Sequence, residues 1–197
     1  MEPNKLAAIE WAQHRMDEEF IILDVETNAW GKGIQSEVIQ IGIINKYGDV
    51  LLNAMICPNG EVQQQATDLH GITNETLRGA APFKAMWPVI ANIIIRHETV
   101  IAYNAKFDRG KLLADVERWE LSDTVLQPVW GCAMLAFAEY HGERHPKTGD
   151  YKWQKLDTAV DVFDIDIPRE LHDATLDVRL TLEVIKAMAA LGENDND

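Results

Sequence analysis

Two acids stand at the end of a short apolar segment, in the sequence FIILDVET at residues 20–27. The apolar residues predict a buried strand, and side chains on a strand alternate between its two faces. Asp24 and Glu26 are two positions apart, so we expect both carboxylates on one face. Two like charges on a buried strand are costly unless a cation lies between them, and a hard divalent ion with oxygen ligands meets that need. The alternative is a frayed strand end with both acids in water.

Two further acids lie where other predicted elements meet the sheet. Asp108 falls in the first turn of a predicted helix, directly after a predicted strand, and ligands of open α/β sheets collect at such strand ends. It also fits a first-turn acid that the helix dipole favours. Asp177 lies one turn inside a helix that Asp173 would cap, on its apolar face, where a lone carboxylate needs a partner such as a metal. His172 is the one histidine of six beside such an acid, and taken alone a histidine there is more often structural than catalytic.

Several of these residues belong to short segments with a family resemblance. DVET at 24–27, YNAKFD at 103–108 and HDATLD at 172–177 together resemble the three motifs of the DnaQ-like DEDDh exonucleases. Two more segments fit that family, LHGIT at 69–73 and KLDTA at 155–159. The resemblance runs in register from about residue 20 to residue 189, and GCAM at 131–134 resembles the exonuclease X-like members.

The resemblance implies an RNase H-like fold and a metal-dependent 3′→5′ exonuclease that releases 5′-mononucleotides. It implies two divalent ions, Mg²⁺ or Mn²⁺, held by four catalytic acids: Asp24, Glu26, Asp108 and Asp177. His172 becomes the general base toward the attacking water, since a histidine pKa of about 6.5 suits proton transfer near neutral pH. A histidine five residues before the last aspartate, rather than a tyrosine four before it, indicates the DEDDh branch.

Five further residues are predicted to contact the substrate: Thr27, Trp30, His70, Asn104 and Phe107. Trp30 and His70 would stack on or bond to the terminal bases, as aromatic side chains commonly do with single strands. Trp30 equally suits a partly buried anchor of its loop. Where the family usually has Thr-Gly after the first motif, this chain continues with Asn28 and Ala29, which leaves the shape of that loop open.

Basic residues occur in two groups, one after the second motif (Lys106, Arg109, Lys111) and one in the polar loop 141–155 (Arg144, Lys147, Lys152, Lys155). Either group could contact phosphates or form a solvated face, and for Lys111 we favour the solvated face. We expect the other tryptophans to be packing residues, namely Trp11, Trp87, Trp119, Trp130 and Trp153.

The overall composition limits the class of partner. A protein that holds long duplexes by its general field is expected to be basic, whereas this chain carries a net charge of −14. Single-stranded 3′ ends or short oligonucleotides, held locally, fit better. The longest apolar run, at 89–95, is too short to span a bilayer, and the N-terminus lacks a signal-peptide pattern. With Cys57 and Cys132 isolated and expected to be reduced, we predict a cytoplasmic protein with no membrane partner.

The pattern of elements predicts an α/β fold with a mixed central sheet of about five strands flanked by helices. The first three strands form an antiparallel meander, and the five strands are expected at 20–27, 37–45, 50–57, 99–103 and within 125–132. We expect one exonuclease domain over residues 1–197, with an N-terminal helical extension at 1–19 and a disordered tail at 192–197.

Single-stranded DNA is the expected substrate. An exoribonuclease, including one acting on short oligoribonucleotides, is the nearest alternative, and a catalytically silent nucleic-acid-binding module of the same fold is a second. The sequence leaves open the sugar, the metal, a homodimer, the pathway and a proofreading role.

Overall fold

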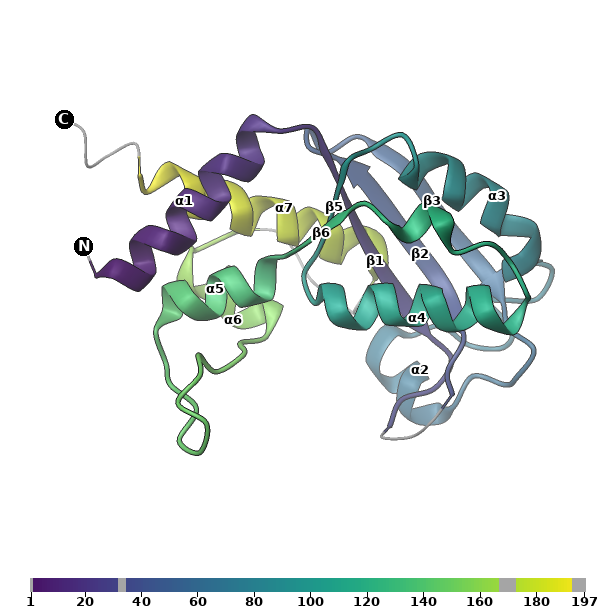
Figure 1. Cartoon of the computed structure of the whole chain (residues 1–197). Helices are drawn as coiled ribbons and strands as arrows, with labels where there is room; N and C mark the ends of the chain where they lie inside the picture. The colour runs from purple at the N-terminus through teal and green to yellow at the C-terminus, as the bar shows by residue number, and fades with distance from the viewer. Residues whose placement is uncertain (1, 32–34, 167–172, 193–197) are drawn as a thin grey trace.

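A mixed sheet of six strands forms the centre of the computed structural model, which describes residues 2–31, 35–166 and 173–192 (Figure 1). The strands are β1 (Phe20–Thr27), β2 (Val38–Asn45), β3 (Val50–Cys57), β4 (Ala81–Pro82), β5 (Thr99–Ala102) and β6 (Val129–Cys132). Their order across the sheet is β4-β3-β2-β1-β5-β6. The meander of β1, β2 and β3 is antiparallel, whereas β5 is parallel to β1 and β6 to β5. The predicted mixed sheet is confirmed, and the sixth strand is the two-residue β4.

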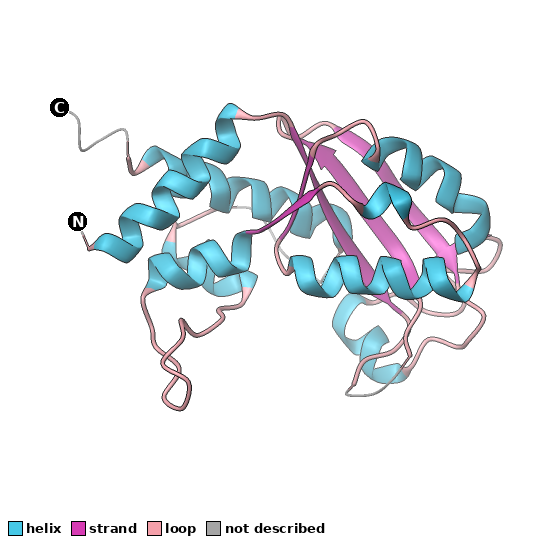
Figure 2. Ribbon diagram, viewed as in Figure 1, coloured by secondary structure: helices cyan, strands magenta, loops and turns pink. Residues whose placement is uncertain are grey.

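Helices cover both faces of this sheet (Figure 2). They are α1 (Pro3–Asp17), α2 (Gln64–His70), α3 (Phe83–Ile94), α4 (Ala105–Arg118), α5 (Ala133–His141), α6 (Leu156–Val162) and α7 (Ala174–Ala190), with a short 3₁₀ turn at Thr124–Leu126. Helices α3 and α4 lie on one face and α7 on the other, and the predicted N-terminal helix α1 packs on α5 and α7.

Strand β1 separates two apolar cores because its side chains alternate. Phe20 and Ile22 are buried in the core shared with α1, α5, α6 and α7. Ile21 and Leu23 are buried in the core shared with α3 and α4. Each face of β1 is therefore covered by helices, which leaves its carboxyl end as the place where polar side chains reach the surface of the sheet.

No helix in the described ranges is long and apolar enough to cross a membrane. The predicted tail at 192–197 falls almost wholly on residues 193–197, which lie outside the described ranges. That the whole chain forms one exonuclease domain stays a prediction.

Candidate active site

The carboxyl end of β1 presents Asp24 and Glu26 toward α7. Both continue the face that carries Phe20 and Ile22, which packs on that helix. Glu26 is 9% exposed and Asp24 is half-buried. The structure therefore has both carboxylates on one face, and neither lies at a frayed strand end, because β1 continues to Thr27 with Glu26 paired to Gln40 of β2.

Helix α7 brings a third carboxylate to the same place. Its N-cap residue Asp173 accepts hydrogen bonds from the backbone N–H groups of Thr175 and Leu176 at 2.9 and 3.2 Å. Asp177 follows in the first helical turn. Carboxylate oxygens of Asp24, Glu26 and Asp177 all lie within 4.8 Å of one another. Residues 153 positions apart along the chain thus form one acidic cluster.

Asp108 completes the acidic group from the opposite face of the sheet. It lies in the first turn of α4, directly after β5, and is only 2% exposed. Its Oδ1 accepts a hydrogen bond from the backbone N–H of Val25 at 3.2 Å, so the carboxylate is tied to the residue between the two acids of β1. Electrostatic interaction with Glu26 and Asp177 places Asp108 in the same charged group.

Burial and the neighbouring carboxylates disfavour the charged forms of Asp24 and Asp108. Burial, followed by the neighbouring carboxylates of Asp108, Glu26 and Asp177, raises the pKa of Asp24 well above its ordinary value. Burial also raises the pKa of Asp108 to about 8, although backbone hydrogen bonds, first that from Val25, act in the other direction. A hard divalent ion prefers oxygen ligands, and its positive charge would offset the repulsion between these carboxylates. The residues therefore fit a metal site.

A cavity of about 660 Å³ is lined by three of the acids, Asp24, Asp108 and Asp177. Its walls include two largely exposed indoles, Trp30 at 65% and Trp153 at 58% exposure. The prediction that Trp153 is a packing residue is therefore wrong. Its position in the polar segment DYKWQK was the available signal, because a large aromatic residue among polar neighbours has few apolar partners to bury it.

The remaining predicted substrate residues occupy different positions around the cavity. Asn104 and Phe107 line it, and Asn104 caps α4 through its carbonyl, which accepts from the N–H of Phe107 and Asp108. Thr27 is 6% exposed and its hydroxyl donates to the Ala29 carbonyl at 3.1 Å, which turns the chain at the end of β1.

His70 lies beneath this turn rather than on the surface, at 5% exposure. Its Nδ1 accepts a hydrogen bond from the Ile72 N–H at 3.0 Å, which leaves the proton on Nε2, 3.2 Å from the Thr27 carbonyl. Gly71 supplies the left-handed conformation that ends α2 there, with φ of 72°. His70 thereby joins the LHGIT turn to the end of β1 and also borders a small pocket beside Trp30.

His172, predicted as the general base, lies outside the described residues. The adjacent Asp173 is described, and it receives a hydrogen bond from Gln40 of β2, with Nε2 and Oδ2 2.8 Å apart. Gln40 is 1% exposed, and sequence reasoning did not single it out. A polar residue within the apolar strand VIQIGII was the signal that could have found it, because a buried amide requires partners.

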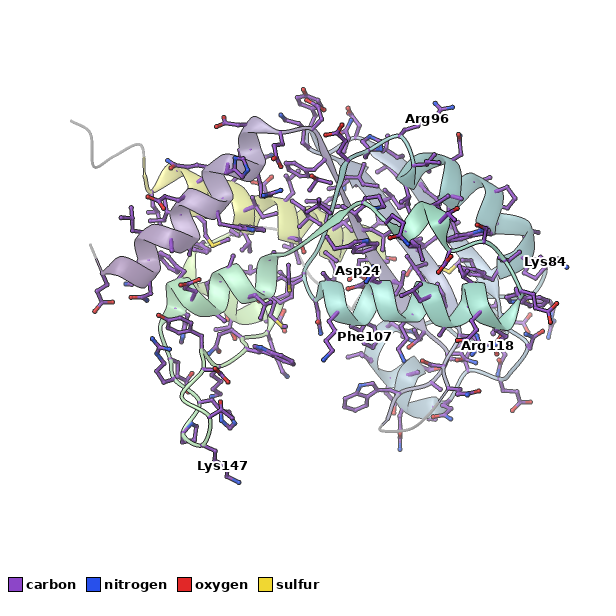
Figure 3. All side chains as sticks on the ribbon, viewed as in Figure 1. Asp24, Lys84, Arg96, Phe107, Arg118 and Lys147 are labelled. Carbon is purple, nitrogen blue, oxygen red and sulfur yellow. The ribbon has the colours of Figure 1, made fainter. Side chains whose placement is uncertain are left out.

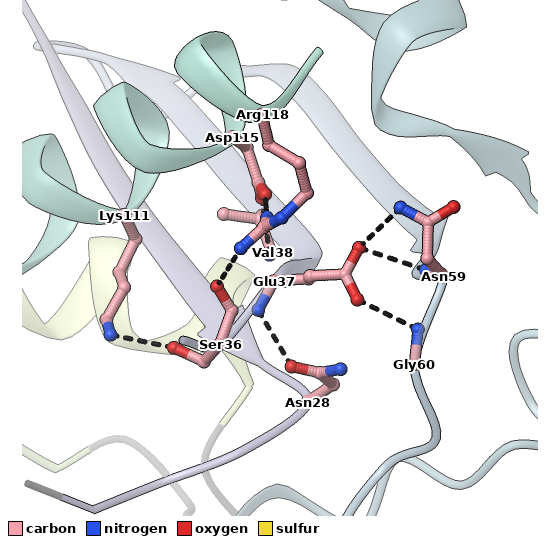
Figure 4. Close-up of polar contacts among 9 residues, drawn as sticks. All are labelled: Asn28, Ser36, Glu37, Val38, Asn59, Gly60, Lys111, Asp115 and Arg118. Atoms are coloured by element: carbon pink, nitrogen blue, oxygen red, sulfur yellow. Dashed lines mark hydrogen bonds and ion pairs between the residues drawn. The ribbon is translucent and has the colours of Figure 1, made fainter. Parts of the chain in front are cut away.

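The loop after β1, whose shape the sequence left open, is tied to its neighbours by polar contacts (Figure 4). Asn28 and Glu37 exchange two hydrogen bonds: the Asn28 N–H donates to the Glu37 carbonyl at 2.9 Å, and the Glu37 N–H donates to Asn28 Oδ1 at 2.7 Å. The Glu37 carboxylate accepts from the N–H and side-chain amide of Asn59 and from the N–H of Gly60. These bonds fix both ends of the loop that carries Trp30.

Helix α4 holds the same region from the other side (Figure 4). Asp115, 1% exposed, accepts from the Val38 N–H at 2.7 Å and forms an ion pair with Arg118. Arg118 also donates to the Ser36 carbonyl at 3.2 Å, and Lys111 Nζ lies 2.7 Å from the Ser36 hydroxyl. The prediction that Lys111 belongs to a solvated face is wrong, because its ammonium is partly buried and bonded across to this loop.

Comparison with known proteins gives a consistent family. The RNase_T model, described as exonuclease, matches residues 21–185. The exonuclease CP81 of Escherichia phage 186 is 31% identical over 185 residues, which cover 92% of this chain and 93% of that protein.

Solved structures agree with the fold. The nuclease domain of 3′hExo, a DEDDh family member bound to rAMP, has a TM-score of 0.66 at 15% identity and covers 89% of this chain and 92% of that one. The zinc-bound complex of E. coli ExoI with single-stranded DNA has a TM-score of 0.73 at 16% identity, over 90% of this chain but 42% of that longer chain. The fold is thus the RNase H-like fold of DnaQ-type exonucleases, as predicted.

Proposed function

The chain belongs to the RNase_T exonuclease family, and on that basis we propose that it is a DEDDh-type 3′→5′ exonuclease that releases 5′-mononucleotides from single-stranded DNA. The observation that carries the proposal is the acidic cluster of Asp24, Glu26 and Asp177, with oxygens within 4.8 Å of one another. Two of its members, Asp24 and Asp177, line a cavity that is bordered by exposed indoles. Acids hold the reactive phosphate through cations, and indoles offer surfaces for bases.

The acidic residues are the proposed ligands of the divalent ions. Asp24, Glu26 and Asp177 would hold Mg²⁺ or Mn²⁺, with the buried Asp108 as the fourth acid. Bound divalent ions supply charge neutralisation at the scissile phosphate and make water a better nucleophile near neutral pH. The hydrogen bond from Val25 fixes Asp108, and the contact of Gln40 with Asp173 fixes the start of α7, so the acids are oriented before substrate arrives.

His172 takes a proton from the attacking water in this proposal. The water oxygen forms a bond to phosphorus, the bond from phosphorus to the 3′-oxygen breaks, and that oxygen ends protonated on a strand one nucleotide shorter. The released product keeps the phosphate on its 5′ carbon. Trp30, Phe107 and Asn104 line the space above the acids and would receive the terminal nucleotide, whereas Thr27 and His70 shape the turn beneath it.

DNA is the first choice of substrate, and the similarity in fold to ExoI in complex with single-stranded DNA supports it. An exoribonuclease is the second candidate, because the similar nuclease domain of 3′hExo holds rAMP. Recognition of a 2′-hydroxyl is what separates the two. A silent binding module is the third possibility, and the cluster of three acids, with Asp108 interacting electrostatically with Glu26 and Asp177, argues against it.

Two matched single-stranded oligonucleotides, one DNA and one RNA, test the proposal. Each is labelled at the 5′ end and incubated with Mg²⁺ or Mn²⁺, with EDTA and an Asp24→Asn variant as controls. We expect a ladder that shortens from the 3′ end, faster for DNA, and lost in both controls. A faster RNA ladder would select the second candidate, and binding without any ladder would select the silent module.

A further inference from the structure

A second cavity, of about 720 Å³, runs along α4 beside the catalytic cavity. The two share three wall residues, Asn104, Phe107 and Trp153. Figure 3 shows Phe107 and Arg118 near the two ends of α4, and both residues line the second cavity. We call this cavity the α4 groove, and its further lining residues are Gln35, Ser36, Lys106, Gly110, Lys111, Ala114, Glu117 and Arg118.

The α4 groove and the catalytic cavity have opposite charge. Three cations line the α4 groove, Lys106, Lys111 and Arg118, with Glu117 as its one acid. The catalytic cavity instead has five aspartates and a single lysine in its lining. In a chain with a net charge of −14, such a local group of cations marks a place where an anion can bind.

The cations of the α4 groove are held in position. The Lys111 ammonium donates to Ser36 and lies 5.1 Å from the centre of the Phe107 ring. Arg118 is held by Asp115 and the Ser36 carbonyl. Lys106 is exposed, and within the described ranges no acid forms an ion pair with it. The groove therefore combines two fixed cations with one that is free to follow a phosphate.

Trp153 stands at the junction of the two cavities on an anchored backbone. Lys152 on one side donates its N–H to the Glu143 carbonyl at 2.8 Å. Gln154 on the other side accepts from the Tyr103 hydroxyl at 3.0 Å through its carbonyl. The loop between α5 and α6 is closed further along by a bridge between Arg144 and Tyr151. The indole is thus presented to solvent by a backbone that other contacts hold in place.

We propose that the α4 groove binds the part of the single strand that precedes its 3′-terminal nucleotide, with Trp153 stacking on a base and Lys106 and Lys111 contacting phosphates. This inference rests on the proposed exonuclease function. The scissile phosphate must lie at the acids, so the rest of the strand has to leave the catalytic cavity. The α4 groove is contiguous with that cavity, carries the opposite charge and offers an aromatic face, which is the combination that holds single strands.

Cleavage of substrates with and without an upstream strand tests the α4 groove. The short substrate is the p-nitrophenyl ester of thymidine 5′-monophosphate, and the long one is a decathymidylate. We expect Trp153→Ala to lower the ratio of kcat/KM, long over short, by about ten-fold, in the range of one lost base stack. Trp153→Phe should restore most of that ratio. Lys106→Ala should lower it less and should flatten the dependence of log(kcat/KM) on log(salt) by about 0.7.

Lys84→Ala is the matched control, because it removes the same charge from an exposed position on α3, a helix that contributes no residue to the groove lining. It should leave the ratio as in the wild type. If the ratio of kcat/KM stayed unchanged in both Trp153→Ala and Lys106→Ala, the proposed role of the α4 groove would be contradicted. The proposed exonuclease activity would still stand, because both substrates would still be cleaved.

Binding separates this inference from the proposed function. The fluorescence anisotropy of a 5′-fluorescein decathymidylate, with Ca²⁺ present, measures binding of the strand. This measurement tests the α4 groove even if the wild type cleaves neither substrate. Weaker binding by Trp153→Ala and Lys106→Ala, but not by Lys84→Ala, supports the groove, and equal binding by all variants contradicts it. A decauridylate in parallel tells whether the groove accepts RNA as well as DNA.

Discussion

The side-chain amide of Gln40 donates a hydrogen bond to the Asp173 carboxylate, with Nε2 and Oδ2 2.8 Å apart. The other atom of the same amide, Oε1, accepts from the Ala174 N–H at 3.3 Å. Strand β2 therefore holds the first residues of α7 through one buried side chain. That helix carries Asp177, and the predicted base His172 directly precedes Asp173, so the contact bears on the geometry of the whole site.

Replacing Gln40 with methionine is expected to lower kcat by about ten- to hundred-fold, because a small misplacement of catalytic groups has effects of that size. Methionine keeps the volume but leaves the Ala174 N–H without its partner, which costs about 1–3 kcal/mol in the free energy of unfolding. Steady-state kinetics on the decathymidylate and urea unfolding measure the two effects. Gln13→Met is the control, since Gln13 donates to Ala189 at the far end of α7. Equal kcat values for the two variants would contradict the role of Gln40.

Gly42 and Gly110 predict opposite effects of the same substitution. A Cβ on Gly42 would lie 2.6 Å from the Ala174 carbonyl oxygen, so Gly42→Ala must displace α7 from β2. We expect it to destabilise the fold by about 1–3 kcal/mol and to reduce activity. At Gly110, inside α4, a Cβ would meet nothing within 4 Å. Gly110→Ala should stabilise by about 0.5–1 kcal/mol through helix propensity. Chemical unfolding of both variants decides, and a neutral Gly42→Ala would argue against close packing of α7 on β2.

The raised pKa values of Asp24 and Asp108 predict an unusual pH dependence of stability. The pKa of Asp108 rises from 3.8 to about 8 in the folded protein, and the pKa of Asp24 shifts in the same direction. Between pH of about 4 and about 8 the unfolded carboxyls are ionised while the folded ones retain protons, so unfolding releases protons and stability falls as pH rises. We expect the Tm of the metal-free protein to decrease from pH 5 to pH 8.

Divalent ions and one variant test the origin of that slope. Mg²⁺ or Mn²⁺ should raise Tm more at pH 8 than at pH 5, because protons compete with the metal for the carboxylates. Asp108→Asn should make the fall of Tm with pH shallower and should reduce the metal-induced rise. A variant with the same slope and the same rise as the wild type would place the effect elsewhere in the chain.

The proposed role of His172 as general base predicts how the rate falls at acidic pH. If it accepts the proton of the attacking water, the rate falls about ten-fold per pH unit below a pKa near 6.5. His172→Asn should remove most of the activity while binding of a labelled strand persists. Single-turnover kinetics from pH 5 to pH 8 measure this, and a flat profile with chemistry rate-limiting would count against His172 as the base.

Local patterns accounted for much of the fold. Strands β1 and β3 begin and end where the sequence predicted them, because a mainly apolar segment of strand length between polar segments is a short-range signal. That Asp24 and Glu26 share a face was also predictable from local sequence, because side chains on a strand alternate between its two faces. The N-cap at Asp173 was also readable, because a cap needs only its own next turn.

Other features required contacts between distant segments. The position of Trp153 between two cavities depends on where the loop 142–155 is anchored, and Lys111 is drawn to Ser36 from 75 residues away. Neither the cavities beside Trp153 nor the contact of Lys111 with Ser36 can be read from the residues next to them in the sequence. The two-residue strand β4 likewise exists only through its pairing with β3.

The sequence by itself determined the class of sheet, the residue types of the acidic group and the family, because these depend on local periodicity and on motifs in order. The resemblance implied that the four acids come together. Only the tertiary structure decided how α7 brings Asp177 to Asp24 and Glu26, that Val25 holds Asp108, and that a cationic groove adjoins the acids. The physical reason is that such contacts follow from how helices pack on the sheet, and packing is set by the whole core rather than by any single segment.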